Sequence, residues 1–200
     1  MRSPLAATLP FLLLGAGCLA PSERSIRLFS TAEVAGDFDS YEIRRVGLLP
    51  FAGAVLTDPE RRQIQEALSA ELARSTPYEI VLLQESDLEA LEKSEPHRRG
   101  WYRPRTILGI ARRHHLDGLL FGTVTSRRFY PPQSIGLEVD LVAAETGLAI
   151  WSSSVHLDAA DPRVRAGLET YYEGEEDWRS ALLSPERFAR FAAFQVAALL

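Results

Sequence analysis

Cysteine is nearly absent from this sequence: Cys18 is the only one among 200 residues. A single cysteine can form neither a disulfide within the chain nor a zinc site built from several thiolates. A free thiol would also be unusual in an oxidising compartment. The position of Cys18 directly after an apolar segment therefore needs an explanation of its own.

The chain also lacks an excess of basic residues. Lys and Arg number 22 against 27 Asp and Glu, which gives a formal net charge of −5 at pH 7. Binding to the phosphates of nucleic acids requires a positively charged surface. We therefore expect no nucleic-acid partner.

Motifs for nucleotide binding and for hydrolysis are missing as well. No G-x-G-x-x-G or Walker loop occurs, and no G-x-S-x-G marks a nucleophile elbow. Ser154, His156 and Asp158 share one face of a predicted strand, but a hydrolase would also need an oxyanion hole. We interpret these three residues as a solvated strand face.

Two other polar groups have a similar interpretation. Glu138 and Asp140 alternate with core positions, so a solvated sheet face explains them better than a glycosidase pair. The adjacent His114 and His115 point apart on a helix, which makes joint metal binding awkward. We predict no enzymatic activity, no cofactor and no metal.

The longest apolar run, residues 5–17, is interrupted only by Thr8 and is shorter than the roughly 20 residues that span a bilayer. It follows Arg2 and ends in the small residues Gly15, Ala16 and Gly17. A positive start, an apolar core and small residues at the end are typical of a signal peptide. We predict a signal peptide over residues 1–17.

The segment Leu14-Gly15-Ala16-Gly17-Cys18 resembles a lipobox, the site of the lipoprotein signal peptidase. It departs from that motif because Gly15 occupies the position, three before the cysteine, where the motif has leucine. The resemblance implies that Cys18 becomes the acylated N-terminus, anchored in a lipid bilayer by fatty acyl chains such as palmitate. Since Leu19 is not aspartate, it also implies the outer membrane, facing the periplasm, in a Gram-negative cell. The alternative is an ordinary secretory leader with an incidental cysteine.

Residues 18–42 show no sustained hydrophobic period, and we predict a lipidated flexible tether with a short ordered piece around residues 26–29. Residues 43–200 are long enough for one domain. The pair Asp58-Pro59 predicts a helix start, which continues to about Ser75. A strand is predicted on each side, over residues 45–49 and 78–83, and further helices at residues 86–91 and 105–115.

The clearest pattern is the alternation of Ile135, Leu137, Val139 and Leu141 with other residues, which predicts a half-buried strand. Gly147 favours a hairpin turn, so residues 119–158 are predicted to form a three-stranded antiparallel meander. Helices should follow from residues 161 and 184. The order predicts an α/β fold of α+β character: a mixed, mostly antiparallel, five-stranded sheet with helices packed on it.

Three stretches together carry a family resemblance: residues 45–51 (RVGLLPF), 116–124 (LDGLLFGTV) and 137–151, which ends in TGLAIW. They resemble the periplasmic lipoprotein superfamily that contains the curli-secretion protein CsgG and the penicillin-binding-protein activator LpoB. The amino-terminal domain of TolB has a similar fold. The resemblance implies a single TolB N-terminal-like periplasmic domain, and it specifies the fold far better than the task.

Two clusters combine arginine with aromatic residues, the residue types that carry much of the binding energy at protein interfaces. We predict that they bind a partner: Arg98, Arg99, Trp101, Tyr102 and Arg103 in one, and Arg127, Arg128, Phe129 and Tyr130 in the other. For both, the alternative is a solvated loop whose aromatic side chains fold back onto the core.

These observations predict a non-catalytic envelope lipoprotein that acts as an adaptor or assembly factor. Its partners would be the lipid bilayer, through Cys18, and another envelope protein, with a second copy of the chain as an alternative. The competing hypothesis is an oligomeric outer-membrane secretion channel, as in the CsgG branch of the family. The chain shows no pair of alternating segments of about 9–11 residues that could leave the core to span a membrane. A third hypothesis is a hydrolase with an unrecognised site.

Overall fold

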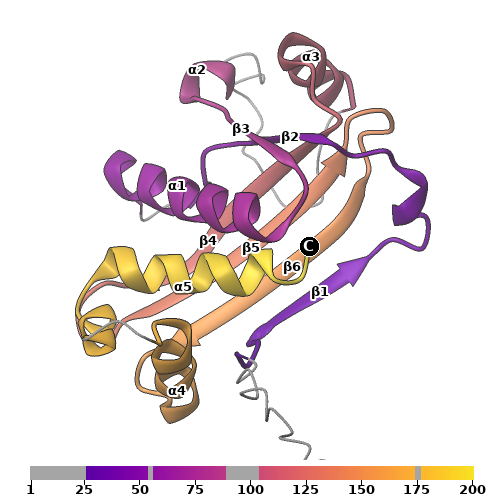
Figure 1. The fold of residues 1–200 in the computed structure, drawn as a ribbon. Helices are drawn as coiled ribbons and strands as arrows, with labels where there is room; N and C mark the ends of the chain where they lie inside the picture. The colour runs from indigo at the N-terminus through magenta and orange to yellow at the C-terminus, as the bar shows by residue number, and fades with distance from the viewer. Residues whose placement is uncertain (1–25, 54–55, 89–103, 174–176) are drawn as a thin grey trace, which may run out of the picture.

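The computed structural model describes residues 26–53, 56–88, 104–173 and 177–200, which build one mixed sheet with helices on it (Figure 1). The strand order is β1-β6-β5-β4-β2-β3. The strands are β1 (Ser30–Val34), β2 (Arg45–Leu48), β3 (Glu79–Leu82), β4 (Gly118–Arg128), β5 (Ser134–Ala143) and β6 (Ala149–Asp158). The three pairings among β1, β6, β5 and β4 are antiparallel, and β4, β2 and β3 are mutually parallel. The mixed, mostly antiparallel α/β fold is confirmed, with six strands instead of five.

Five helices accompany the sheet in the described ranges: α1 (Asp58–Ser75), α2 (Glu85–Leu88), α3 (Pro104–His114), α4 (Pro162–Tyr171) and α5 (Pro185–Ala197). Two short 3-10 turns, η1 (Phe38–Ser40) and η2 (Trp178–Leu182), lie between elements. Helices α1 and α5 lie side by side across one face of the sheet (Figure 1). The prediction of α1 is confirmed in its bounds. Its start is fixed by a capping box in which Thr57 and Glu60 satisfy each other's backbone amides.

The predicted meander is confirmed and extends beyond the predicted strand ends. Leu141 pairs with Leu120 on one side and with Trp151 on the other, and Gly147 takes a positive φ of 71° in the β5–β6 turn. Only glycine adopts that backbone conformation without steric cost. Successive side chains of β5 point to opposite faces of the sheet, as the alternating sequence predicts.

The two faces have separate cores. Between the sheet and α1, α4 and α5 lies the larger core, which is mostly apolar; Leu48, Leu137 and Phe191 are fully buried in it. On the opposite face a smaller core forms where α3 packs Ile107, Ile110 and Ala111 against Leu119 and Val142. Burial of apolar area is the main stabilising contribution to folding, so the first face contributes more of it.

The prediction of a flexible tether over residues 18–42 is wrong for its second half. Strand β1 pairs with β6 from Ser30, opposite Val155, to Val34, opposite Trp151. Gln195 of α5, which is fully buried, also holds the segment just before β1. Its side chain accepts a hydrogen bond from the Phe29 amide and donates one to the Arg27 carbonyl. The folded domain therefore begins well before residue 43.

Candidate interaction surface

Part of the predicted site falls outside the described residues. Cys18 lies there, and so does the whole first aromatic cluster, which consists of Arg98, Arg99, Trp101, Tyr102 and Arg103. The predictions for these six residues stay predictions. The second cluster lies within the described part of the chain, where β4 ends and the connection to β5 begins.

In that second cluster, Arg127 forms a two-pronged ion pair with Glu60 of α1 and lies over the Phe129 ring, 3.4 Å from its centroid. A shift in the β4–β5 register between Val124 and Ser126 precedes Arg127. Partial burial acts to raise the pKa of Glu60, but hydrogen bonds from the Arg127 and Thr57 side chains outweigh it and lower that pKa to about 2. Arg127 thus joins the strand end to the start of α1.

Arg128 is also engaged within the chain. Its Nε donates to the Pro132 carbonyl, and its guanidinium lies 3.3 Å from an Asp158 carboxylate oxygen. Tyr130, by contrast, is 73% exposed. The structure therefore brings the four residues of this cluster together, and the tyrosine ring is the group that it presents to solvent.

The described hydrogen bonds separate the residues of the serine–histidine–aspartate alternative. His156 Nδ1 lies 3.3 Å from the hydroxyl of Ser126, and the Ser154 hydroxyl lies 3.3 Å from that of Thr31. Asp158 bonds to Arg128. These polar side chains line the sheet face opposite α1 and α5.

The prediction that Asp140 lies on a solvated sheet face is wrong. Asp140 is 2% exposed, and Phe121, opposite it on β4, is 8% exposed. Both side chains lie on the face that α3 covers in part, beside the smaller core around Val142. Alternation along β5 located that face correctly, but it could not tell how far burial extends across it.

His114 contacts a carboxylate from another element. Its Nε2 lies 3.0 Å from Asp87, whose other oxygen accepts the Gln84 amide. The contact joins the segment at α2 to the end of α3. Within the described ranges, no three His, Cys, Asp or Glu side chains gather in a way that could hold a metal ion. No helix in these ranges is long and apolar enough to cross a membrane.

A pocket of about 690 Å³ opens beside α3. Its apolar lining comes from α3 and its surroundings: Ile43, Leu108, Ala111, Leu116 and Ala144. Arg112 and His115 border it on the α3 side, and Glu42, Asp117 and Glu145 border it elsewhere. A second hollow of about 570 Å³ lies between α1 and the end of β3 and is lined mainly by polar groups such as Arg61, Arg62 and Gln65.

The exposed side of α3 is a feature that the sequence analysis missed. Arg105, Arg112 and Arg113 are exposed there, and so is Gly109 between them. A glycine inside a helix costs about 1 kcal/mol relative to alanine. A Cβ built on Gly109 would meet nothing within 4 Å, so packing within the described chain does not require glycine here. The signal in the sequence was an 11-residue helix with three basic residues in its last turn and no acid.

Comparisons with known proteins give structural neighbours only. No family profile and no curated protein sequence matches the chain. Among solved structures, the PelC dodecamer from Paraburkholderia phytofirmans is similar with 11% identity and a TM-score of 0.47, over 81% of this chain and 95% of that one.

Two further structures are similar at the same level. LpoB from Escherichia coli has 16% identity and a TM-score of 0.41, over 79% of this chain and 83% of its own. Lipoprotein GNA1162 from Neisseria meningitidis has 15% identity and a TM-score of 0.41, over 57% and 79%. LpoB, named above for the sequence resemblance, is thus among the neighbours. Similarities of this size assign neither a family nor an activity, so we infer the function from the chain's own residues.

Proposed function

We propose that this chain is a lipid-anchored envelope protein that acts as a non-catalytic adaptor or activator and binds another envelope protein. The observation that carries the proposal is the lone Cys18, placed directly after a short apolar leader that ends in three small residues. Acylation explains why a chain with a secretory leader keeps one cysteine. In a Gram-negative cell, Leu19 after the cysteine favours the outer membrane, facing the periplasm.

The anchor would orient the domain. Seven residues lie between Cys18 and Ile26, so these two residues, eight steps apart along the chain, are separated by at most about 29 Å when the chain is extended. Ile26 precedes β1 at the end of the sheet where β6 finishes and where Tyr130 is exposed. That end would face the bilayer, and the end with α3 and the β5–β6 turn would point away from it.

The proposed task needs no catalytic group, because holding one protein at a membrane raises its effective concentration near a second. The two arginine–aromatic clusters remain the proposed contact residues. The cluster of residues 98–103 directly precedes α3 in the sequence. The cluster of residues 127–130 lies at the membrane side, where the exposed Tyr130 is suited to an interface between water and apolar groups.

Acylation is tested with Cys18→Ser, with Ser22→Ala as a control that changes a neighbouring residue and keeps the thiol. We expect Cys18→Ser to leave the membrane fraction and to lose the fatty acyl mass from its N-terminal peptide, whereas Ser22→Ala should keep both. A freely soluble mature protein that carries an unmodified Cys18 thiol would end the proposal.

The adaptor role is tested by cross-linking in cells, followed by detergent extraction. We expect a specific envelope protein to be captured, and Trp101→Ala/Tyr102→Ala to reduce that capture. A stable ring of many copies of this chain after extraction would contradict the adaptor role and favour the secretion channel instead.

A further inference from the structure

We infer that the exposed side of α3 is a docking face for an acidic protein segment that also carries an apolar side chain. The α3 docking face is defined here by Arg105, Gly109, Arg112 and Arg113. The inference rests on the proposed anchor, which points this face away from the bilayer, and it adds the chemistry of the partner to the proposed function.

Charge is the first argument. Arg105, Arg112 and Arg113 are exposed on a helix that has no acidic residue, in a chain with net charge −5. Among the described residues, none of these three guanidinium groups forms an ion pair. Positions 105 and 112 lie two helical turns apart, about 10.5 Å, so the face presents guanidinium groups at its two ends. Guanidinium binds carboxylate with two parallel hydrogen bonds.

Gly109 is the second argument, and it is independent of charge. It lies four residues after Arg105 and three before Arg112, on the same side of the helix. It does not adopt a positive φ, unlike Gly53 and Gly147, and the space that a Cβ would occupy is open. A helix-weakening residue that nothing within the described chain requires leaves room for a partner to approach closely between the arginines.

The pocket of about 690 Å³ beside α3 distinguishes a protein segment from an anionic polysaccharide as the partner. Leu108, Ala111 and Leu116 give it apolar walls, and Arg112 belongs to both the pocket and the α3 docking face. A protein segment can place an apolar side chain there and its carboxylates on the arginines, whereas an anionic polysaccharide has no such side chain. Two of the three acids on the other side have partners of their own: Asp117 accepts the Arg44 and Arg45 backbone amides, and Glu42 pairs with Arg44. The third, Glu145, is exposed.

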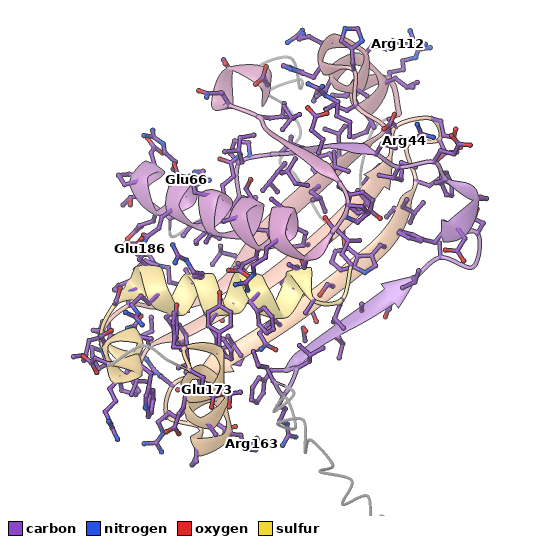
Figure 2. All side chains as sticks on the ribbon, viewed as in Figure 1. Arg44, Glu66, Arg112, Arg163, Glu173 and Glu186 are labelled. Atoms are coloured by element: carbon purple, nitrogen blue, oxygen red, sulfur yellow. The ribbon has the colours of Figure 1, made fainter. Side chains whose placement is uncertain are left out.

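A second copy of this chain fits less well. Three of its exposed acids, Glu169, Glu173 and Asp177, lie at the opposite end of the molecule from Arg112; Figure 2 labels Glu173 and Arg112 at these two ends. Its exposed acids near α3, Glu42 and Glu145, border the pocket that Arg112 also borders. Pairing the two ends would stack one copy on another and lift the second anchor off the bilayer. We therefore assign the acidic segment to a different protein.

The probe is a labelled 12-residue peptide of alternating Glu and Leu, titrated by fluorescence anisotropy against the full mature chain in detergent. We expect saturable binding that Arg112→Glu/Arg113→Glu weakens by about tenfold or more, since like charges then face each other. The matched control is Arg62→Glu/Arg190→Glu, which makes the same change of charge at two exposed arginines on α1 and α5. It should change affinity by less than about twofold.

Gly109→Gln tests the second argument. Because glutamine favours helix more than glycine does, this variant should unfold at the same or a higher temperature than the parent. It should nevertheless bind the peptide about fivefold more weakly, because its side chain fills the space between the arginines. Binding that Gly109→Gln and the α3 charge reversal both leave unchanged overturns the inference.

Two other anionic polymers test whether the partner must be a protein segment with apolar side chains. A Glu/Ser peptide or polygalacturonate that binds as tightly as the Glu/Leu peptide would assign the face to polyanions in general and overturn the assignment to a protein segment. Failure of the wild-type chain to bind the Glu/Leu peptide would overturn it as well. Release of Cys18→Ser from the membrane is measured in a separate experiment. A failure of the docking proposal therefore does not contradict the lipid anchor, and a failure of the lipid anchor does not contradict peptide binding.

Discussion

The two faces of the sheet differ in what covers them. Along β5, Leu137, Val139 and Leu141 point to the face under α1 and α5, where apolar side chains continue from strand to strand. Glu138 and Asp140 point to the other face, where apolar residues gather only under α3. The comparison teaches that one face carries most of the stability, which leaves the other free to carry polar groups and a surface helix.

Phe191→Ala is the substitution with the largest expected effect. Phe191 is fully buried on the first face, and its ring centroid lies 5.5 Å from that of Tyr171. Removing a buried aromatic ring leaves a cavity, so we expect the free energy of unfolding to fall by about 3–5 kcal/mol. Urea denaturation followed by tryptophan fluorescence measures it.

Ile110→Ala makes the corresponding change on the second face. Ile110 is 2% exposed in the smaller core under α3. We expect a loss of about 2–3 kcal/mol in the same urea experiment, because the site lies in a thinner layer that can relax around the cavity. A loss larger than that of Phe191→Ala would break the comparison between the faces.

The ion pair of Glu60 and Arg127 predicts a pH dependence of stability. The folded pKa of Glu60, about 2, lies below the usual value near 4.5. The contribution of ionised Glu60 to the free energy of unfolding is therefore present above about pH 4.5 and is lost as the pH falls towards 2. Glu60→Gln should cost about 1–2 kcal/mol at pH 7, allowing for solvent screening, and less at pH 3. Unfolding measured at both pH values tests this.

Glu66→Gln is the control for that measurement. It removes the same charge from an exposed position on the same helix (Figure 2). Its effect at pH 7 should stay within about 0.5 kcal/mol. Equal effects of the two substitutions would show that the Arg127 contact adds nothing.

The smallest effects are expected from two adjacent serines on opposite faces. Ser153 is fully buried on the first face, and its hydroxyl has no hydrogen-bond partner in the described part of the chain. Because a buried hydroxyl without a partner is costly, Ser153→Ala should stabilise the protein by up to about 1 kcal/mol. Ser154→Ala, on the second face, should be neutral within about 0.5 kcal/mol. Thermal unfolding of both variants distinguishes them, and a destabilised Ser153→Ala contradicts the expectation.

Local signals predicted much of this fold. The pair Asp58-Pro59 marked the start of α1, and the alternation from Ile135 to Leu141 marked β5, because caps and side-chain periods are encoded within a few residues. Strand β1 was missed because the residues that hold it, those of β6 and Gln195, are far from it in the sequence. No short-range pattern contains those contacts.

The candidate site was harder to predict for the same reason. Arginine next to aromatic residues drew attention to residues 127–130, but the partners of Arg127 and Arg128 are Glu60 and Asp158, which are distant in sequence. The arginines of α3 can be read directly from the sequence of residues 104–114. Its exposure follows only from the packing of Ile107 and Ile110 on the other side of the helix.

Strand β1 has a mechanical consequence. It lies at the edge of the sheet, antiparallel to β6, and the chain enters it from the end that holds Ile26. Tension between the N-terminus and the α3 end would act along the strand axis. The backbone hydrogen bonds from Ser30 to Val34 would then be sheared together instead of being unzipped one at a time, so the domain should resist such pulling better than its short first strand would suggest.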